Sequence, residues 1–174
     1  MRPPIAVIFL SFLFMMPLSG HAGEEDQLYR KAVAAARAGN TDFAFMYYNE
    51  LDRDYPHSRY RDQALFAKGE YYYQLPCYPE ATRIFQSFVQ DYPNSDGKLF
   101  ALVYLYKMAE AGQDQAALEE AKKEILTLRQ VGLIFKESKE YKYRSASFQD
   151  YRAVFRIDKV EFYKGGELFA TVSY

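Results

Sequence analysis

The chain has 174 residues, 49% of them hydrophobic and 26% charged, which is ordinary for a globular protein able to bury its own core. Its formal net charge is −1 at pH 7, so it lacks the basic character typical of proteins that bind nucleic acids or anionic lipids. The 17 tyrosines are unusual, and most of these rings are expected to fill the core or coat a binding surface.

The N-terminal residues 1–22 are predicted to be a secretory signal peptide. Arg2 supplies positive charge, the apolar run that follows is short for a membrane span, and Gly20 and Ala22 give a small-x-small cleavage site. The alternative is an uncleaved anchor, but the apolar run ends at Pro17 without a basic stop-transfer flank. Cleavage would leave a mature chain that begins near Gly23 and is exported, most simply to a bacterial periplasm.

Cys77 is the only cysteine, so an intramolecular disulfide is impossible. No cysteine stands at the end of the signal segment to carry a lipid, and we therefore expect a soluble protein without a lipid anchor, unless a partner holds it peripherally at the outer membrane. Cys77 lies in a proline-rich loop, where it could form an intermolecular disulfide or simply be a tolerated small residue.

The sequence "DYPHS", beginning at Asp54, returns as "DYPNS" at Asp91, 37 residues later. A repeat of this period is typical of stacked helical units. Apolar residues recur at helical spacing before each copy, and a second helical segment precedes each of these. Each unit is therefore predicted to be a helical hairpin. Proline ends the unit, and Ser58 and Ser95 are expected to cap the next helix.

The second unit resembles a tetratricopeptide repeat. The signature positions are occupied by Leu65, Gly69, Tyr72, Ala81, Phe85 and Pro93. The first unit keeps only part of this signature, and a third unit is expected at 97–128, where the signature is largely lost. The predicted fold is mainly α: a stack of about three helical hairpins (23–130) follows the signal peptide (1–22) and precedes a C-terminal segment (131–174) with a small β-hairpin.

The amino-acid sequences of the units are similar to those of exported repeats of the outer-membrane assembly lipoprotein type, and to those of the periplasmic coordinator of the Tol-Pal system. The similarity rests on "FQSFVQDYPNS" at 85–95 and "ALFAKGEYYY" at 64–73, and it extends over about residues 24–130. The resemblance implies a periplasmic protein that acts in outer-membrane assembly or maintenance. The chain departs from the assembly lipoprotein in lacking a lipidated cysteine.

The C-terminal segment alternates apolar and polar residues, as β-strands do. Gly165 and Gly166 between two such runs predict a hairpin, with Leu168, Ala170 and Val172 on one face. An isolated hairpin is marginal in water, so it should pack on the helices, pair with a strand near 131–135, or pair with another molecule. Packing within the chain is favoured.

The sequence offers little for catalysis or for cofactor binding. His57, the only histidine after the signal segment, lies in a "DYP" joint and is interpreted as a turn residue. Metal-site spacing, a glycine-rich phosphate loop and a nucleophile elbow are all missing. We therefore expect no enzyme activity, no cofactor and no metal.

Because no enzyme activity is expected, the function of the protein is predicted to depend on a surface that binds a partner. By the resemblance, the first helix of each unit lines a concave groove suited to an extended peptide or a partner helix. The predicted partner-binding residues are Tyr29, Arg37, Gln63, Phe66, Glu70, Tyr73, Gln74 and Lys107. Val33, Phe100 and Val103 share these helix faces, and for Phe66, Phe100 and Val103 a core role under the tail is an equal alternative.

Two functions follow from these features. The first is a non-catalytic adaptor that binds an envelope protein or peptide in the groove. The second is a structural protein whose C-terminal hairpin mediates self-association or strand addition. An envelope hydrolase or cell-wall binder is a remote third possibility.

Overall fold

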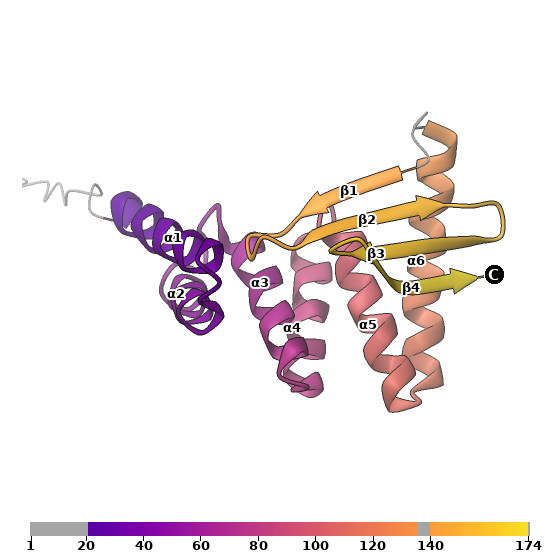
Figure 1. Ribbon diagram of the computed structural model, residues 1–174, viewed down its shortest axis with the longest axis horizontal. Coiled ribbons are helices and arrows are strands. Elements are labelled where there is room, and N and C mark those ends of the chain that lie inside the picture. Colours follow the sequence, from indigo (N-terminus) through magenta and orange to yellow (C-terminus); the bar gives the residue numbers. More distant parts are fainter. Residues whose placement is uncertain (1–20, 136–139, 174) are drawn as a thin grey trace, which may run out of the picture.

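The computed structural model describes residues 21–135 and 140–173, so most of the predicted signal peptide lies outside the described residues. Within these ranges, helices come first and a four-stranded sheet follows (Figure 1). The helices are α1 (His21–Arg37), α2 (Thr41–Asp54), α3 (Arg61–Gln74), α4 (Tyr78–Asp91), α5 (Lys98–Gly112) and α6 (Gln115–Phe135). The strands are β1 (Glu140–Arg144), β2 (Asp150–Phe155), β3 (Lys159–Lys164) and β4 (Glu167–Ser173).

Consecutive helices pack as three hairpins, α1 with α2, α3 with α4, and α5 with α6, and each hairpin also contacts the next. This arrangement confirms the predicted mainly α fold with a small C-terminal β region. The close crossing within the second hairpin depends on Gly69, because a Cβ there would lie 2.6 Å from the ring of Phe85. Glycine at this signature position thus makes room for the large residue of the facing helix.

The two "DYP" joints repeat the same hydrogen bonds. The Ser58 amide donates to the Tyr55 carbonyl at 2.9 Å, and the Ser95 amide donates to the Tyr92 carbonyl at 3.1 Å. The prediction that the serines cap the next helices was wrong, because α3 and α5 begin three residues after the serines and have Tyr60 and Gly97 at their N-caps. Each serine hydroxyl instead accepts from the amide two residues on, at 3.2 Å and 3.3 Å, and so closes the turn itself.

The sheet is an antiparallel meander in the order β1-β2-β3-β4. The predicted hairpin is present as β3 and β4, with Gly165 and Gly166 at positive φ in the turn. Residues 131–135 are helical, so the alternative of pairing with a strand there was wrong. The hairpin pairs instead with β2.

A bulge changes the predicted face of β4. Phe162 pairs with Ala170 while Tyr163 pairs with Leu168, so Phe169 is an extra residue in the ladder. Phe169 therefore packs beside Tyr104, with ring centroids 5.1 Å apart, and Leu168 is 60% exposed. The strict alternation expected for Leu168 fails because one extra residue reverses the direction of the side chains.

The sheet lies across helices α3 and α5 and shares their hydrophobic core (Figure 1). The ring of Phe66 on α3 lies 5.1 Å from that of Tyr143 on β1, and Phe100 on α5 lies 5.1 Å from Tyr151 on β2. Helix α5 is apolar around most of its circumference because the sheet covers one side of it and neighbouring helices flank the others. Helices and sheet thus form one packed body.

Candidate functional site

The sheet occupies most of the concave side where partner binding was predicted. Phe66 and Glu70 are 0% and 1% exposed, and Phe100 and Val103 also belong to the core, as the alternative interpretation had it. The remaining predicted residues are exposed (Arg37, Gln74) or half-buried (Tyr29, Gln63, Tyr73, Lys107). The groove is therefore filled by the chain's own sheet over α3 and α5.

Glu70 anchors the sheet to the helices. Its carboxylate accepts hydrogen bonds from the hydroxyls of Ser147 and Tyr151, and from that of Ser145 at 3.2 Å. Burial raises the pKa of the Glu70 carboxyl above its ordinary value, while these hydroxyl donors and the charge of Lys164 act in the opposite direction. A buried carboxylate without such donors would be strongly destabilising.

The hydrogen bonds continue from Glu70 to Lys164 on β3, which lies directly opposite Tyr151 of β2. The Tyr104 and Tyr151 hydroxyls are 2.6 Å apart, and the Lys164 ammonium donates to the Tyr104 hydroxyl at 2.7 Å. Because lysine can only donate and an ionised carboxylate can only accept, the chain runs in one direction: Lys164 to Tyr104, Tyr104 to Tyr151, Tyr151 to Glu70. Burial lowers the pKa of the Lys164 ammonium.

A small cavity of about 90 Å³ borders Glu70, Ser147 and Gln74 between the first and second hairpins. It has room for a few water molecules at about 30 Å³ each. Binding sites for small molecules are usually larger, with volumes of about 300 Å³ or more. The described residues contain no cluster of three or more His, Cys, Asp or Glu that could hold a metal ion. The arrangement around Glu70 thus serves to bind the sheet to the helices.

The first hairpin meets the rest of the molecule through predicted site residues. The Tyr29 hydroxyl donates to the Gln63 amide oxygen, and the Tyr29 ring stacks on Tyr60 with centroids 3.9 Å apart. The Arg37 guanidinium lies 5.1 Å from the ring centroid of Phe148, in the loop between β1 and β2. Tyr29, Gln63 and Arg37 therefore have structural contacts within the chain.

Tyr73, Gln74 and Lys107 lie toward the C-terminal ends of α3 and α5, and Tyr73 packs beside β4. The Tyr73 ring packs against Tyr104 at 4.7 Å and against Phe169 at 6.0 Å, and Lys107 pairs with Glu110 at 2.9 Å. Burial raises the pKa of the Tyr73 hydroxyl. This end of the concave side, together with Arg37, is the part of the predicted surface that is not fully covered by the sheet.

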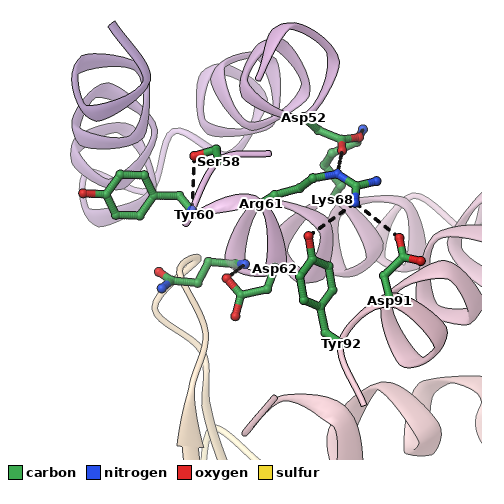
Figure 2. Close-up of polar contacts among 9 residues, drawn as sticks. Asp52, Ser58, Tyr60, Arg61, Asp62, Lys68, Asp91 and Tyr92 are labelled. Atoms are coloured by element: carbon green, nitrogen blue, oxygen red, sulfur yellow. Dashed lines mark hydrogen bonds and ion pairs between the residues drawn. The ribbon is translucent and has the colours of Figure 1, made fainter. Parts of the chain in front are cut away.

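Arg61 joins three helices at the first "DYP" joint. Figure 2 shows it between Asp52 of α2, at 2.9 Å, and Asp91 and Tyr92 at the end of α4, at 3.2 Å and 3.3 Å. Lys68 also pairs with Asp52, at 2.7 Å. Burial alone would raise the pKa of Asp52, but the hydrogen bonds and charges of Lys68 and Arg61 outweigh it and lower the pKa. His57, in the same joint, is exposed.

No sequence pattern pointed to Ser145, Ser147, Tyr151 or Lys164 as functional residues. A glutamate within the run 64–70, which is buried throughout, signals that a hydrogen-bonding partner is needed. Its hydroxyl partners lie 75 to 81 residues later in the chain, so the pattern near Glu70 could not identify them.

Residues 21–156 match the profile of a known family, YfiO, described as an outer membrane lipoprotein. The match covers all the helices named above, β1 and β2, and ends before β3 and β4. A comparison with curated protein sequences gave no significant match. Among the residues that the structure describes, no helix is both long enough and apolar enough to cross a bilayer.

Proposed function

Because this chain belongs to the outer membrane lipoprotein family YfiO, we propose that it is a non-catalytic adaptor that binds a protein partner during assembly or maintenance of the outer membrane. The family match over the whole helical stack is the observation that carries this proposal. Stacked helical repeats support it, because they present extended surfaces to other proteins.

The accessible part of the concave side is the proposed binding surface. Arg37 and Gln74 are exposed, Lys107 is half-buried, and Tyr73 is half-buried beside Phe169 of β4. Phe66 and Glu70 contribute indirectly, because they hold the sheet that bounds this surface. The half-buried tyrosine can anchor a bound peptide segment, and the exposed polar groups can fix the register of that segment along the surface.

The proposed location is the periplasmic side of the outer membrane, after export. The expectation that the protein has no lipid anchor receives no support from its family, which is described as a lipoprotein. The alternative to a role in outer-membrane assembly is a role in the Tol-Pal system, to whose periplasmic coordinator the repeat sequences are also similar.

In-cell crosslinking from a photoreactive residue at position 74 tests the proposal. Gln74 is exposed, so the substitution leaves the core packing of Tyr73 intact. Position 123, an exposed lysine on α6, is the matched control. We expect position 74, and not position 123, to capture a component of outer-membrane assembly or of the Tol-Pal system. Capture of no envelope protein from either position would contradict the adaptor function.

A second candidate function is self-association or strand addition through β4. The observation in its favour is that β4 pairs only with β3 among the described strands, which leaves one edge open. The bulge at Phe169 weighs against it, because bulges commonly protect edge strands. Light scattering on the purified protein decides: a dimer that Thr171→Lys converts to a monomer favours this candidate, and a monomeric wild type excludes self-association.

A further inference from the structure

A long groove lies on the side of α5 that faces away from the sheet. It has a volume of about 750 Å³ and is bounded by α4, α5 and α6. The floor is a stripe of α5 at helical spacing, namely Lys98, Leu102, Leu105, Ala109 and Gly112. At 3.6 residues per turn this stripe is opposite the α5 residues that pack on the sheet. The groove thus uses a surface that the adaptor site above does not.

The length of the groove matches that of a helix. The floor stripe runs the whole length of α5, which at 1.5 Å per residue is about 21 Å, or about four turns. Leu105 in the middle of the floor and Val89 on the α4 wall are only half-buried, so apolar surface stays accessible. An apolar trough of this length between helices suits the apolar face of a further α-helix.

One end of the groove is lined by small residues. Ala109 and Gly112 of α5 meet Ala117 and Ala121 of α6 there. A Cβ placed on Gly112 would have no other atom within 4 Å, so this end has open space. Small residues leave room for a large side chain of an occupant and let its backbone come close.

The two walls differ in charge. Arg83 is the only charged residue of α4 in the lining, whereas the α6 side carries Asp114, Glu120 and Glu124. Glu124 is paired with Lys98 at 3.6 Å, but Arg83 and Glu120 have no ion pair within the described part of the chain. An occupant with acidic residues toward α4 and basic residues toward α6 would complement both walls.

We propose that this groove binds an amphipathic α-helix of about four turns from a partner protein of the envelope. Its apolar stripe lies on α5, its acidic flank faces Arg83, and its basic flank faces Glu120. The inference rests on the proposed adaptor function, for which it names a second binding surface and the kind of segment bound.

The test uses a fluorescent helical peptide of about 16 residues, with a leucine stripe, glutamates on one flank and lysines on the other. Its affinity for the purified protein is measured by anisotropy. Ala117→Trp fills the small-residue end, and we expect it to weaken binding at least about tenfold. Ala116→Trp is the matched control, because Ala116 is exposed on the same helix but outside the groove. It should bind like the wild type.

A second arm tests the charges. When a helix keeps its apolar face on the floor and is turned end for end, its acidic and basic flanks exchange places. The charges of the two walls should therefore decide which way the bound peptide runs along the groove. A photoreactive group at the peptide N-terminus is expected to label one end of the groove, and the double variant Arg83→Glu, Glu120→Lys should move the label to the other end. A label that stays in place overturns the charge assignment.

Equal binding by Ala117→Trp and wild type, or no binding at all, overturns the proposal. A dimer of the purified protein that Ala117→Trp dissociates would assign the groove to a second copy of the chain and overturn it too. Capture from position 74 in cells reports on the adaptor function independently, so a failed peptide assay leaves that function standing.

Discussion

Glu70 carries the strongest residue-scale constraint in the molecule. It is 1% exposed, yet Ser145, Ser147 and Tyr151 supply hydroxyl donors, so its carboxylate is not left without hydrogen bonds. Charge compensation comes from Lys164 through two tyrosine hydroxyls rather than by direct contact. Because these donors come from the β1–β2 loop and β2, one helix residue positions the sheet on the stack.

The titration of Glu70 should appear in the pH dependence of stability. Its pKa is raised in the folded state above the ordinary value of 4.5, so the folded state binds more protons than the unfolded state at pH values between the two. The contribution of Glu70 to stability should therefore be fully present below pH 4.5 and be lost as pH rises through the folded pKa, by at most about 1.4 kcal/mol per pH unit. Urea unfolding of wild type and Glu70→Gln from pH 5 to 8 measures this; the variant should lack that slope, and parallel profiles would contradict the assignment.

Arg61 should matter more for stability than its exposed neighbour Arg59. Arg61 is 24% exposed and reaches Asp52 of α2 and Asp91 and Tyr92 at the end of α4, whereas Arg59 is 67% exposed and pairs with Asp26 on α1. Arg61→Ala should lower the free energy of unfolding by about 1–2 kcal/mol, because it removes the hydrogen bonds that join α2 to the end of α4 and leaves the half-buried Asp52 with Lys68 as its remaining ion-pair partner. Arg59→Ala should cost less than about 0.5 kcal/mol. Chemical denaturation compares the two; equal losses would show that the joint does not depend on Arg61.

At the scale of elements, the second hairpin depends on the absence of a side chain at Gly69. A Cβ would lie 2.6 Å from Phe85, whose ring is buried and stacked against Tyr104 at 4.6 Å, so neither partner can move easily. Gly69→Ala should destabilise by about 1–3 kcal/mol despite the better helix propensity of alanine. Gly112→Ala is the control, because it has open space at the end of α5 and should be neutral or slightly stabilising. Thermal unfolding that shows the same small effect for both would remove the packing argument.

The elements were predictable where local pattern decides them. The helices follow from periodicity and from the repeated "DYP" joints, and the β3–β4 turn follows from Gly165 and Gly166. β1 was missed because its sequence, "EYKYR", alternates tyrosine with charged residues and carries no strong apolar signal. The inward turn of Phe169 was missed because a bulge depends on pairing with β3, which the sequence of one strand does not encode.

At the scale of the whole molecule, the sequence identified the helix faces of the predicted site but left open whether they line a groove or are covered by the C-terminal tail. Phe66, Glu70 and Phe100 lie on the concave side of the stack, as expected from the repeat. Their aromatic and apolar character equally fits a core, and the sheet that turns them into a core is formed by residues 140–173. Such long-range packing leaves no local signal, because each segment retains a pattern that would suit either role.

The distribution of hydrophobic clusters predicts that stability is uneven along the stack. One large cluster joins α3, α4, α5, α6 and the sheet, while a second, smaller one joins α1 and α2 to one side of α3. The smaller cluster consists largely of alanines, so it buries less apolar surface per residue, and we expect α1 and α2 to open at a lower free energy than α5 and β3. The hydroxyl of Tyr48 donates to the carbonyl of Ala146 at 3.0 Å and ties this hairpin to the β1–β2 loop. Native-state hydrogen exchange should show faster exchange of backbone amides in α1 and α2 than in α5 and β3.

Tyr48→Phe should speed amide exchange in the first hairpin by about fivefold, corresponding to about 1 kcal/mol for one lost hydrogen bond, and leave exchange in α5 unchanged. Uniform protection across all helices would mean instead that the stack and the sheet open only together, with the first hairpin coupled fully to the large core.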